Sequence, residues 1–423
     1  MADTLLLNPI LGSVLGFFAK TWFLWVPGAL FFIFAEVWLN YVRALFISQL
    51  KWILLEVRVP REVAKSPKAM ESILAGIHGT AKSADFIEKY WKGFVPPWFS
   101  LEIVGDETGV HFYIWTQEFF RKMIEAQVYA QYPSSEVTIV EDYTKNLPPA
   151  IPDERWNLWG TEFMLTRPDA YPIRTYEDFA LEKISVKEEE TKIDPLSALV
   201  EFMGLLTPGE KIWIQIIITP AGTEWKEAGE QLIAKITGRE DKAVEFLPTQ
   251  IVHGINAEIA KALGIESEQK REDKQSKLSN LTPGERDVLI AIEKNIGKLG
   301  FYTGIRWLYV AERDRYNGLA IPALMGIFKQ FASPSMNGFK PNRAASTSAG
   351  YFRKKIIEAR KKLRIYNAYR LRSFFALPYL GKKFVFNTSE LATIYHFPGT
   401  VAGSPGLSRV EAKKGAPPTN LPI

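Results

Sequence analysis

The densest chemistry in this sequence is a run of cations near its C-terminal end. Between Lys340 and Lys383 lie thirteen basic residues and the single acid Glu358, a net charge of +12. Tyr351–Phe375 is predicted to be a helix in which aromatic rings alternate with these cations. Cations bind phosphates and aromatic rings can stack on bases. The residues that we expect to bind a nucleic acid or another anionic partner are Arg353, Lys354, Lys355, Arg360, Lys361, Lys362, Arg364, Arg370 and Arg372.

The basic run has two alternative roles, and both stay open. One is attraction to anionic lipid or to an acidic protein, since each basic residue near an anionic membrane contributes about 1 kcal/mol. The second is a solvated helix face that keeps the chain soluble. The whole chain of 423 residues carries only +5, so the rest of it is acidic on balance.

Motifs for catalysis or for cofactor binding are missing from the sequence. Cysteine is absent, which excludes disulfides, thiolate metal sites and a cysteine nucleophile. The sequence contains no G-x-S-x-G elbow and no G-x-x-x-x-G-K-[ST] phosphate loop. The four histidines lack metal-ligand spacing and are expected to be ordinary surface or half-buried side chains; they are His78, His111, His253 and His396. The sequence therefore predicts a protein without catalytic residues, metal or cofactor.

The N-terminal residues have a composition typical of a membrane anchor. Residues 21–42 contain one carboxylate, Glu36, and are long enough to cross a bilayer core. Basic residues follow from Arg43 onward, which predicts an inner-membrane protein whose body faces the cytoplasm. Residues 5–19 are also apolar and are either a second short membrane segment or an interfacial helix. The alternative for the main segment is a buried hairpin.

The body is predicted to be α/β (α+β). In residues 50–150, strands at 51–60, 98–104, 110–115 and 136–143 alternate with helices at 66–79 and 117–131. The order β-α-β-β-α-β is that of the ferredoxin-like split βαβ unit. The residues GDETG between the two central strands carry the chemistry of a hairpin turn.

A second α/β block is predicted over 151–264 and 281–340, interrupted by a charged linker or insertion at 265–280. Its strands are expected at 161–166, on the sheet edge, and at 211–219 and 301–310. Its helices are expected at 195–206, 223–237, 251–263, 282–299 and 318–331, the fourth opened by a T-P-G-E cap. The division of the chain is completed by the anchor at 1–49, the basic helical segment at 341–387 and an extended tail at 388–423.

Several long runs resemble one known family. SLEIV at 100–104 leads to VHFYIW at 110–115, and EAQVYAQYP at 125–133 precedes VTIVEDYT at 137–144. The later runs are AIEKNIGKLGFYTGIRWLYVA, GIFKQFASPSMNGFK, LATIYHFPGTV and SRVEAKKGAPPTNLP, at 291–311, 326–340, 391–401 and 408–422. In this order they resemble the N-terminal, non-ATPase region of bacterial conjugation-type DNA-translocating ATPases, the coupling-protein and VirB/VirD-like motors of type IV secretion.

The resemblance implies a role beside a motor. In that family the last runs lead into a Walker-bearing ATPase, whereas this chain ends at Ile423, where the motor is expected to begin. The resemblance therefore implies a membrane-anchored, non-catalytic adaptor of a secretion or conjugation-like machine. Its expected partners are a separate ring ATPase, DNA, membrane lipid and further copies of itself. Two alternatives stay open, a membrane-associated enzyme whose site is assembled only in the fold and a scaffold that binds anionic lipid.

Overall fold

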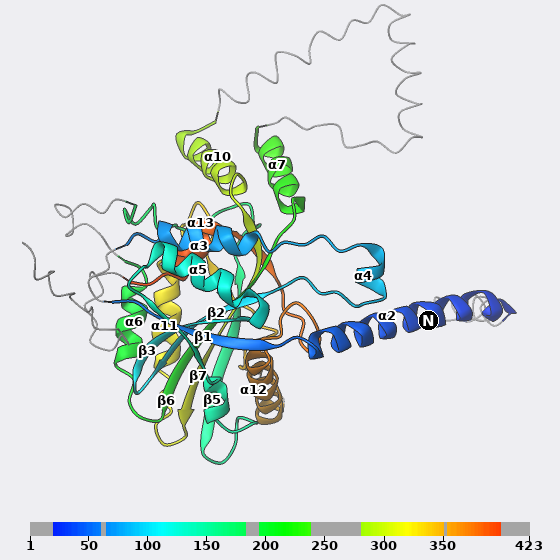
Figure 1. Cartoon of the computed structure of the whole chain (residues 1–423), viewed down its shortest axis with the longest axis horizontal. Coiled ribbons are helices and arrows are strands. Elements are labelled where there is room, and N and C mark those ends of the chain that lie inside the picture. Colours follow the sequence, from blue (N-terminus) through cyan, green and yellow to red (C-terminus); the bar gives the residue numbers. More distant parts are fainter. Residues whose placement is uncertain (1–19, 61–64, 183–193, 238–280, 351–352, 399–423) are drawn as a thin grey trace, which may run out of the picture. The chain divides into compact units, whose positions relative to one another are not determined.

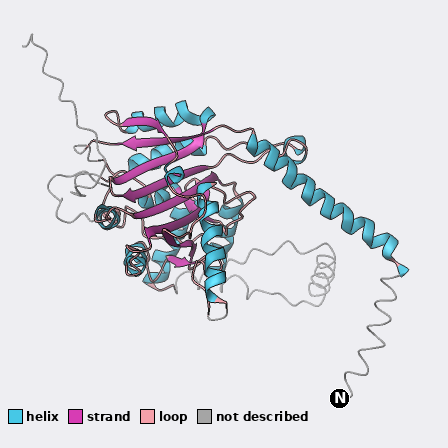
Figure 2. Cartoon of the chain, turned by 90° about the horizontal axis from the view of Figure 1, so that it is seen from below, coloured by secondary structure: helices cyan, strands magenta, loops and turns pink. Residues whose placement is uncertain are grey.

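The computed structural model divides the chain into two compact units (Figures 1 and 2). One unit comprises Met1–Leu50 and Lys82–Pro96, and the second, called the body here, comprises Lys51–Ala81 and Pro97–Ile423. The residues that the structure describes are 20–60, 65–182, 194–237, 281–350 and 353–398. The predictions for residues 5–19, 251–263 and 265–280 and for the tail beyond residue 398 lie outside the described residues.

The first unit is built on helix α2 (Trp22–Ser48), which continues six residues beyond the predicted segment. Within the described residues, α2 is the one helix long and apolar enough to cross a membrane. Its most apolar window has a mean hydropathy of 1.7, and no residue of that window is buried. A short helix, α4 (Phe86–Tyr90), belongs to the same unit and is capped by the Asp85 carboxylate, which accepts a hydrogen bond from the backbone N–H of Glu88.

The body is a mixed α/β structure around one antiparallel sheet, which Figure 2 shows with helices on both faces. Its strands are β1 (Trp52–Arg58), β2 (Phe99–Asp106), β3 (Gly109–Gln117), β4 (Glu136–Val140), β5 (Trp156–Leu165), β6 (Glu210–Pro220), β7 (Gly300–Glu312), β8 (Phe339–Pro341) and β9 (Phe384–Asn387). Its helices are α3 (Lys68–His78), α5 (Arg121–Gln131), α6 (Ser197–Gly204), α7 (Glu224–Thr237), α10 (Pro283–Ile296), α11 (Ala320–Lys329), α12 (Lys354–Arg370) and α13 (Thr388–Ile394), with the 3-10 turns η1 (Glu118–Phe120) and η2 (Tyr143–Asn146).

The sheet repeats one topology. Its strand order is β4-β1-β3-β2-β6-β7-β5-β8, with β9 paired to β7. In each half, four consecutive strands are arranged as fourth, first, third and second, and helices follow the first and third of them. The halves meet where β2 pairs antiparallel with β6, with Glu102 opposite Gln215. The second half differs from the first between its central strands, where α7 and α10 lie in the chain between β6 and β7. It also differs in that β9 pairs with β7.

The two faces of the sheet are covered differently (Figure 1). Because side chains alternate along a strand, each strand contributes to both faces. One face packs the larger core against α3, α5, α6, α11 and α13, with residues such as Ile73, Ile216 and Leu324. The opposite face packs a smaller cluster, which includes Leu308, against α12, where Trp213 stacks with Tyr366 and Tyr369. The basic helix is therefore a structural layer of the body.

Helix α10 begins as its sequence indicates. Thr282 and Glu285 form a capping box, with Pro283 at the first helical position. Its apolar side packs with α7 through Ile292, Ile296 and neighbours in a separate small cluster.

Three predictions for the body are wrong in detail. The strand expected at 161–166 is the longer β5, and it lies between β7 and β8 rather than at an edge. The tail expected to be extended from residue 388 begins instead with α13, whose seven residues are all buried. The basic segment, predicted as helical over 341–387, also contains strand β9, which pairs with the first residues of β7. These short elements depend on long-range pairing, which local periodicity does not reveal.

Candidate anion-binding surface

Helix α12 is held on the sheet by its aromatic residues. Tyr369 stacks on Trp213 with ring centroids 5.3 Å apart, and Tyr366 donates a hydrogen bond to the carbonyl of Pro148 at 2.8 Å. Both tyrosines and Ile365 are buried. Their i, i+1 and i+4 spacing turns one side of the helix inward and leaves the opposite side to solvent.

A row of polar residues crosses the sheet beneath α12. Glu102, Gln215, Arg306 and Glu162 are directly opposite one another on β2, β6, β7 and β5. All four are at most 1 % exposed. Charges removed from water this fully are stable only when they are paired and hydrogen-bonded. The row therefore requires partners from outside the sheet or from its own members.

The first partner is Arg372, just beyond the end of α12. Its guanidinium donates to both carboxylate oxygens of Glu102, at 3.0 and 3.1 Å, and also to Asp142. Burial by itself would raise the pKa of Asp142, but the hydrogen bonds and charge of Arg372 hold that pKa below its ordinary value. Although burial opposes it, the charge of Glu102 raises the pKa of Arg372 well above its ordinary value.

Arg372 was expected on the binding surface, and that expectation is wrong. Its side chain is 1 % exposed and is committed to two carboxylates. The reason is local: Arg372 adopts a left-handed conformation with φ of 47°, so the chain turns inward directly after the helix. A continued helix would have placed it elsewhere.

Arg306 is the second cation of the row and comes from the sheet itself. It donates to Glu162 at 3.2 Å, to Gln215 at 3.3 Å and to the carbonyl of Ser373 at 2.9 Å. Burial lowers its pKa, against the opposing charge of Glu162. Because residues 372 and 373 bond to both Glu102 and Arg306, the chain after α12 ties the two halves of the sheet together.

The remaining predicted binding residues divide into two groups. Those exposed to solvent are Arg353, Lys354, Lys355, Arg360 and Arg364. Three are half-buried and bonded to the body: Lys361 to the carbonyls of residues 343 and 348, Lys362 to the side chain of residue 157 and Arg370 to the carbonyl of residue 149. Burial lowers the pKa of Lys362.

A groove of about 350 Å³ lies beside the exposed side of α12. Lys361, Arg364 and Lys382 line it, together with the ring of Tyr379. The guanidinium carbon of Arg364 lies 5.0 Å from the centre of that ring, an arrangement that holds the cation in place. The buried carboxylate of Glu162 also borders the groove and is paired with Arg306. Three cations around one hollow form a surface suited to phosphate or carboxylate groups. Lys382 is not among the predicted binding residues, although it lies in the basic run between Lys340 and Lys383.

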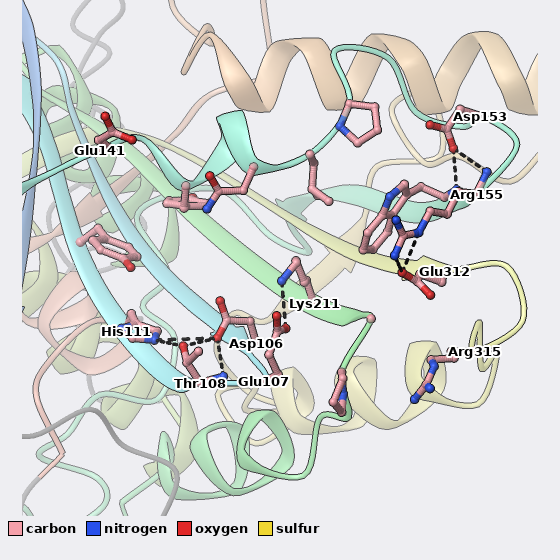
Figure 3. Close-up of a pocket in the computed structure, with 18 of the residues that line it drawn as sticks. Asp106, Glu107, Thr108, His111, Glu141, Asp153, Arg155, Lys211, Glu312 and Arg315 are labelled. Atoms are coloured by element: carbon pink, nitrogen blue, oxygen red, sulfur yellow. Dashed lines mark hydrogen bonds and ion pairs between the residues drawn. The ribbon is translucent and has the colours of Figure 1, made fainter.

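A larger cleft of about 980 Å³ lies at the end of the sheet near the β2–β3 turn (Figure 3). Two ion pairs join some of its charged side chains. Lys211 contacts Glu107 at 3.0 Å, and Arg155 donates to Glu312 at 2.8 Å. The lining nevertheless has five acids against three cations, so the cleft is acidic on balance, unlike the groove beside α12.

The cleft also contains a histidine between two polar groups. His111 Nδ1 lies 2.8 Å from Glu56. Its Nε2 lies 2.9 Å from the hydroxyl of Thr108 (Figure 3). The order carboxylate, imidazole, hydroxyl is that of a nucleophilic relay. However, Asp106 also accepts a hydrogen bond from the Thr108 hydroxyl, at 2.5 Å, so this hydroxyl is shared between a carboxylate and the imidazole. The arrangement instead braces the β2–β3 hairpin.

His396 departs from the expectation of a surface or half-buried histidine. It is 2 % exposed, and its Nε2 lies 3.2 Å from Asp194. Burial would raise the pKa of Asp194, but the charge and hydrogen bond of His396 lower it. In the described part of the chain, no cluster of three or more His, Cys, Asp or Glu is arranged to hold a metal ion.

The chain belongs to the family described as a domain of unknown function, DUF8128, whose family model matches residues 46–404. The match begins inside α2 and includes the whole described body. No curated protein matches the chain.

Proposed function

We propose that this protein is a membrane-anchored, non-catalytic adaptor of a type IV secretion or conjugation-like translocation machine. Helix α2 supplies the anchor, with the body on the cytoplasmic side. We further propose that the two halves of the sheet are ferredoxin-like units, since both follow the strand order of a split βαβ fold. The resemblance of the sequence runs to the non-motor region of conjugation ATPases supports a position beside a separate ring ATPase.

The proposed task of the body is to bind an anionic partner, with DNA as the first candidate. The observation that carries this proposal is the exposed basic side of α12 beside a groove with three cations. The inward side of the same helix is fixed to the sheet by Tyr366, Tyr369 and the neighbouring Arg372. A rigid helix presents its charges without the entropy loss of ordering a flexible segment.

The test is DNA binding by the full chain in nanodiscs as a function of salt. The variant carries Lys355→Gln, Arg360→Gln and Arg364→Gln on the exposed side of α12. The control carries Lys68→Gln, Lys122→Gln and Lys235→Gln, which remove the same charge from exposed positions on α3, α5 and α7. Each lost phosphate contact lowers the slope of log K against log salt by about 0.9 for duplex DNA.

We expect the α12 variant to bind DNA more weakly and with a smaller salt slope, while the control keeps the slope of the unaltered chain. Equal losses in both variants would mean that net charge alone attracts DNA. Absence of salt-dependent binding in the unaltered chain would remove DNA as the ligand.

A second candidate partner is an acidic protein surface such as that of the motor. The observation that favours it is the pair of apolar side chains Ile356 and Leu363, which are 54 % and 39 % exposed between the cations of α12. Exposed apolar groups rimmed by charges are typical of protein interfaces. Copurification with a Walker-bearing ATPase, lost on Ile356→Asp and kept on Ile290→Asp in α10, would support this candidate.

A further inference from the structure

Helix α2 has two sections with different surroundings. From Trp22 to Val37 its side chains are exposed or only partly covered, and none is buried. From Trp38 onward one side is covered by the segment Lys82–Pro96, and Val42 is the one residue of the helix that is buried. The uncovered section is about 24 Å long at 1.5 Å per residue, close to the thickness of a bilayer's hydrocarbon core.

The covering segment is fixed to α2 by specific contacts. The indole N–H of Trp38 donates to the carbonyl of Tyr90 at 3.1 Å, and the rings of Trp38 and Trp91 lie 5.9 Å apart. Further along the helix, Phe46 and Phe94 have ring centroids 5.7 Å apart. Figure 1 shows α4 in this segment alongside α2.

Gly93 allows the backbone of this segment to approach α2 closely. A Cβ at Gly93 would lie 2.3 Å from the carbonyl group of Val42, and its φ of +66° is one that side-chain-bearing residues rarely adopt. Backbone contact of this kind aligns the segment at a fixed level on the helix. This contact lies at Val42, one helical turn beyond Trp38, and the uncovered section ends just before Trp38.

The outer surface of the covering segment is strongly apolar. Phe86, Ile87 and Trp91 are 72 %, 59 % and 69 % exposed, although they lie within one short stretch. Lysines lie among them: Lys82, Lys89 and Lys92. Lys89 lies over the ring of Tyr90, with its Nζ 5.3 Å from the ring centre. Aromatic rings with flanking lysines are typical of the zone between lipid headgroups and acyl chains.

We propose that residues 82–96 form a second membrane contact, which lies in the headgroup layer of the same leaflet that α2 crosses at Trp38. Phe86, Ile87 and Trp91 enter the boundary of the acyl chains. Lys89 and Lys92 contact anionic headgroups, whereas Lys82 is paired with Glu88. The occupant is lipid because the exposed patch is continuous with the uncovered apolar section of α2 through Trp91, Trp38 and Phe34. Inserted to this depth, α4 fixes where α2 leaves the bilayer.

This inference rests on the proposed membrane span, so the experiment tests the two separately. The chain has no cysteine, so a single labelling site can be introduced without removing any native residue of that type. Single variants Leu30→Cys in α2, Ile87→Cys in α4 and Glu230→Cys in α7 of the body carry an environment-sensitive fluorophore. The labelled full chains are reconstituted in vesicles of phosphatidylcholine and phosphatidylglycerol. The quenchers are aqueous iodide and lipids spin-labelled near the headgroup or deep in the acyl chain.

We expect the label at position 30 to be quenched best by the deep lipid label and the label at position 87 by the shallow one. Emission at position 87 shifts to the blue relative to position 230, and iodide quenching falls several-fold. Position 230 responds to iodide alone. If position 87 behaves like position 230 while position 30 is quenched by the deep label, the interfacial contact is refuted and the membrane span stands.

Two further results also decide the matter. Protection of position 87 from iodide without quenching by either lipid label would show that protein covers the patch, which refutes the lipid contact. Absence of lipid quenching at position 30 would refute the membrane span and with it the contact that depends on it. Quenching of position 87 by the deep label would place α4 in the hydrocarbon core and refute the headgroup position.

Discussion

The two halves of the sheet share a strand order but neutralise their buried charges in different ways. At equivalent positions on the first strand of each half lie Glu56 and Glu162. Glu162 is paired with Arg306, which is fully buried on the neighbouring strand. Glu56 is paired with His111 and with Arg58, whose side chain is 37 % exposed. The same topology thus contains one dry ion pair and one that water can reach.

The first half also depends on a cation that it does not contain. Glu102 on β2 is neutralised by Arg372 from the chain after α12. The second half supplies Arg306 from β7, and the adjoining residue Ser373 accepts a hydrogen bond from it. The segment after α12 therefore completes one half and braces the second. Any partner bound to α12 is therefore attached to both halves.

The largest effect is expected from Arg372→Met. The change leaves Glu102 and Asp142 without their cation in a buried site, and loss of one partner of a buried ion pair costs about 3–5 kcal/mol. Urea unfolding of the full chain in detergent measures the free energy of unfolding. Arg364→Met, which removes an exposed cation from the same region, is the matched control and should change it by less than about 0.5 kcal/mol.

A second substitution checks the cause of that loss. In the Arg372→Met background, Glu102→Gln should restore part of the stability because it removes the buried charge left unpaired. If the double variant is as unstable as the sum of both single changes, the ion pair is not the source of the effect.

A smaller loss, of about 3 kcal/mol, is expected from Arg306→Met. Arg306 has one carboxylate partner where Arg372 has two, and its Nε makes no hydrogen bond within the described part of the chain. The same unfolding measurement applies, with Arg313→Met, an exposed cation near the end of β7, as the control. A loss larger than that of Arg372→Met would contradict the view that the C-terminal segment carries the more important pair.

Much of this sheet could be predicted from the sequence because its elements are strongly patterned. Apolar runs typical of strands indicated β1, β2, β3, β6 and β7, and helical patterns or caps indicated α3, α5, α7, α10 and α11. The first half was the clearer one, since its central strands are joined by the short turn GDETG. In the second half the helices α7 and α10 separate the central strands, so its equivalence to the first half is visible only in the strand order.

The partition of the basic residues could not be predicted. Arg364 and Arg372 have the same chemistry and lie within one short run, yet one borders the groove and the second is buried. The difference arises from the left-handed turn at Arg372 and from acids more than two hundred residues away in the sequence. The polar row could not be predicted either, because Glu102 and Arg306 lie within otherwise apolar strands. In the sequence they resemble ordinary strand residues that face solvent.

The C-terminal segment also contains a buried carboxyl group, that of Glu390, which sharpens the contrast between paired and unpaired sites. Burial raises the pKa of Glu390 to about 8, although the backbone N–H groups of Asn387 and Ile173 lower it. The unfolded carboxyl has its ordinary pKa of 4.5. The bound proton of Glu390 therefore stabilises the folded state fully below pH 4.5, and this stabilisation is lost as the pH rises through 8. Between these values the free energy of unfolding falls by about 1.4 kcal/mol per pH unit.

Glu390→Gln should flatten that pH dependence, because an amide does not ionise. Urea unfolding between about pH 5.5 and pH 7.5 compares the two slopes. Arg372 holds the pKa of Asp142 below its ordinary value, so this pair contributes no slope in the same interval. Equal slopes for the variant and the unaltered chain would show that Glu390 does not bind its proton in this range.

The smallest effect is expected at the solvent-accessible pair of the first half. Glu56→Gln should lower the free energy of unfolding by about 1 kcal/mol, because Arg58 stays hydrated and His111 keeps its contact with Thr108. Burial would raise the pKa of Glu56, but the hydrogen bonds and charges of His111 and Arg58 hold it below 4.5. The contribution of Glu56 to stability is therefore present above pH 4.5 and disappears as the pH falls. Glu162→Gln at the equivalent position leaves Arg306 buried without a carboxylate, and its loss should be at least twice as large. Equal losses would mean that the shared topology, and not the access of water, determines the strength of these two pairs.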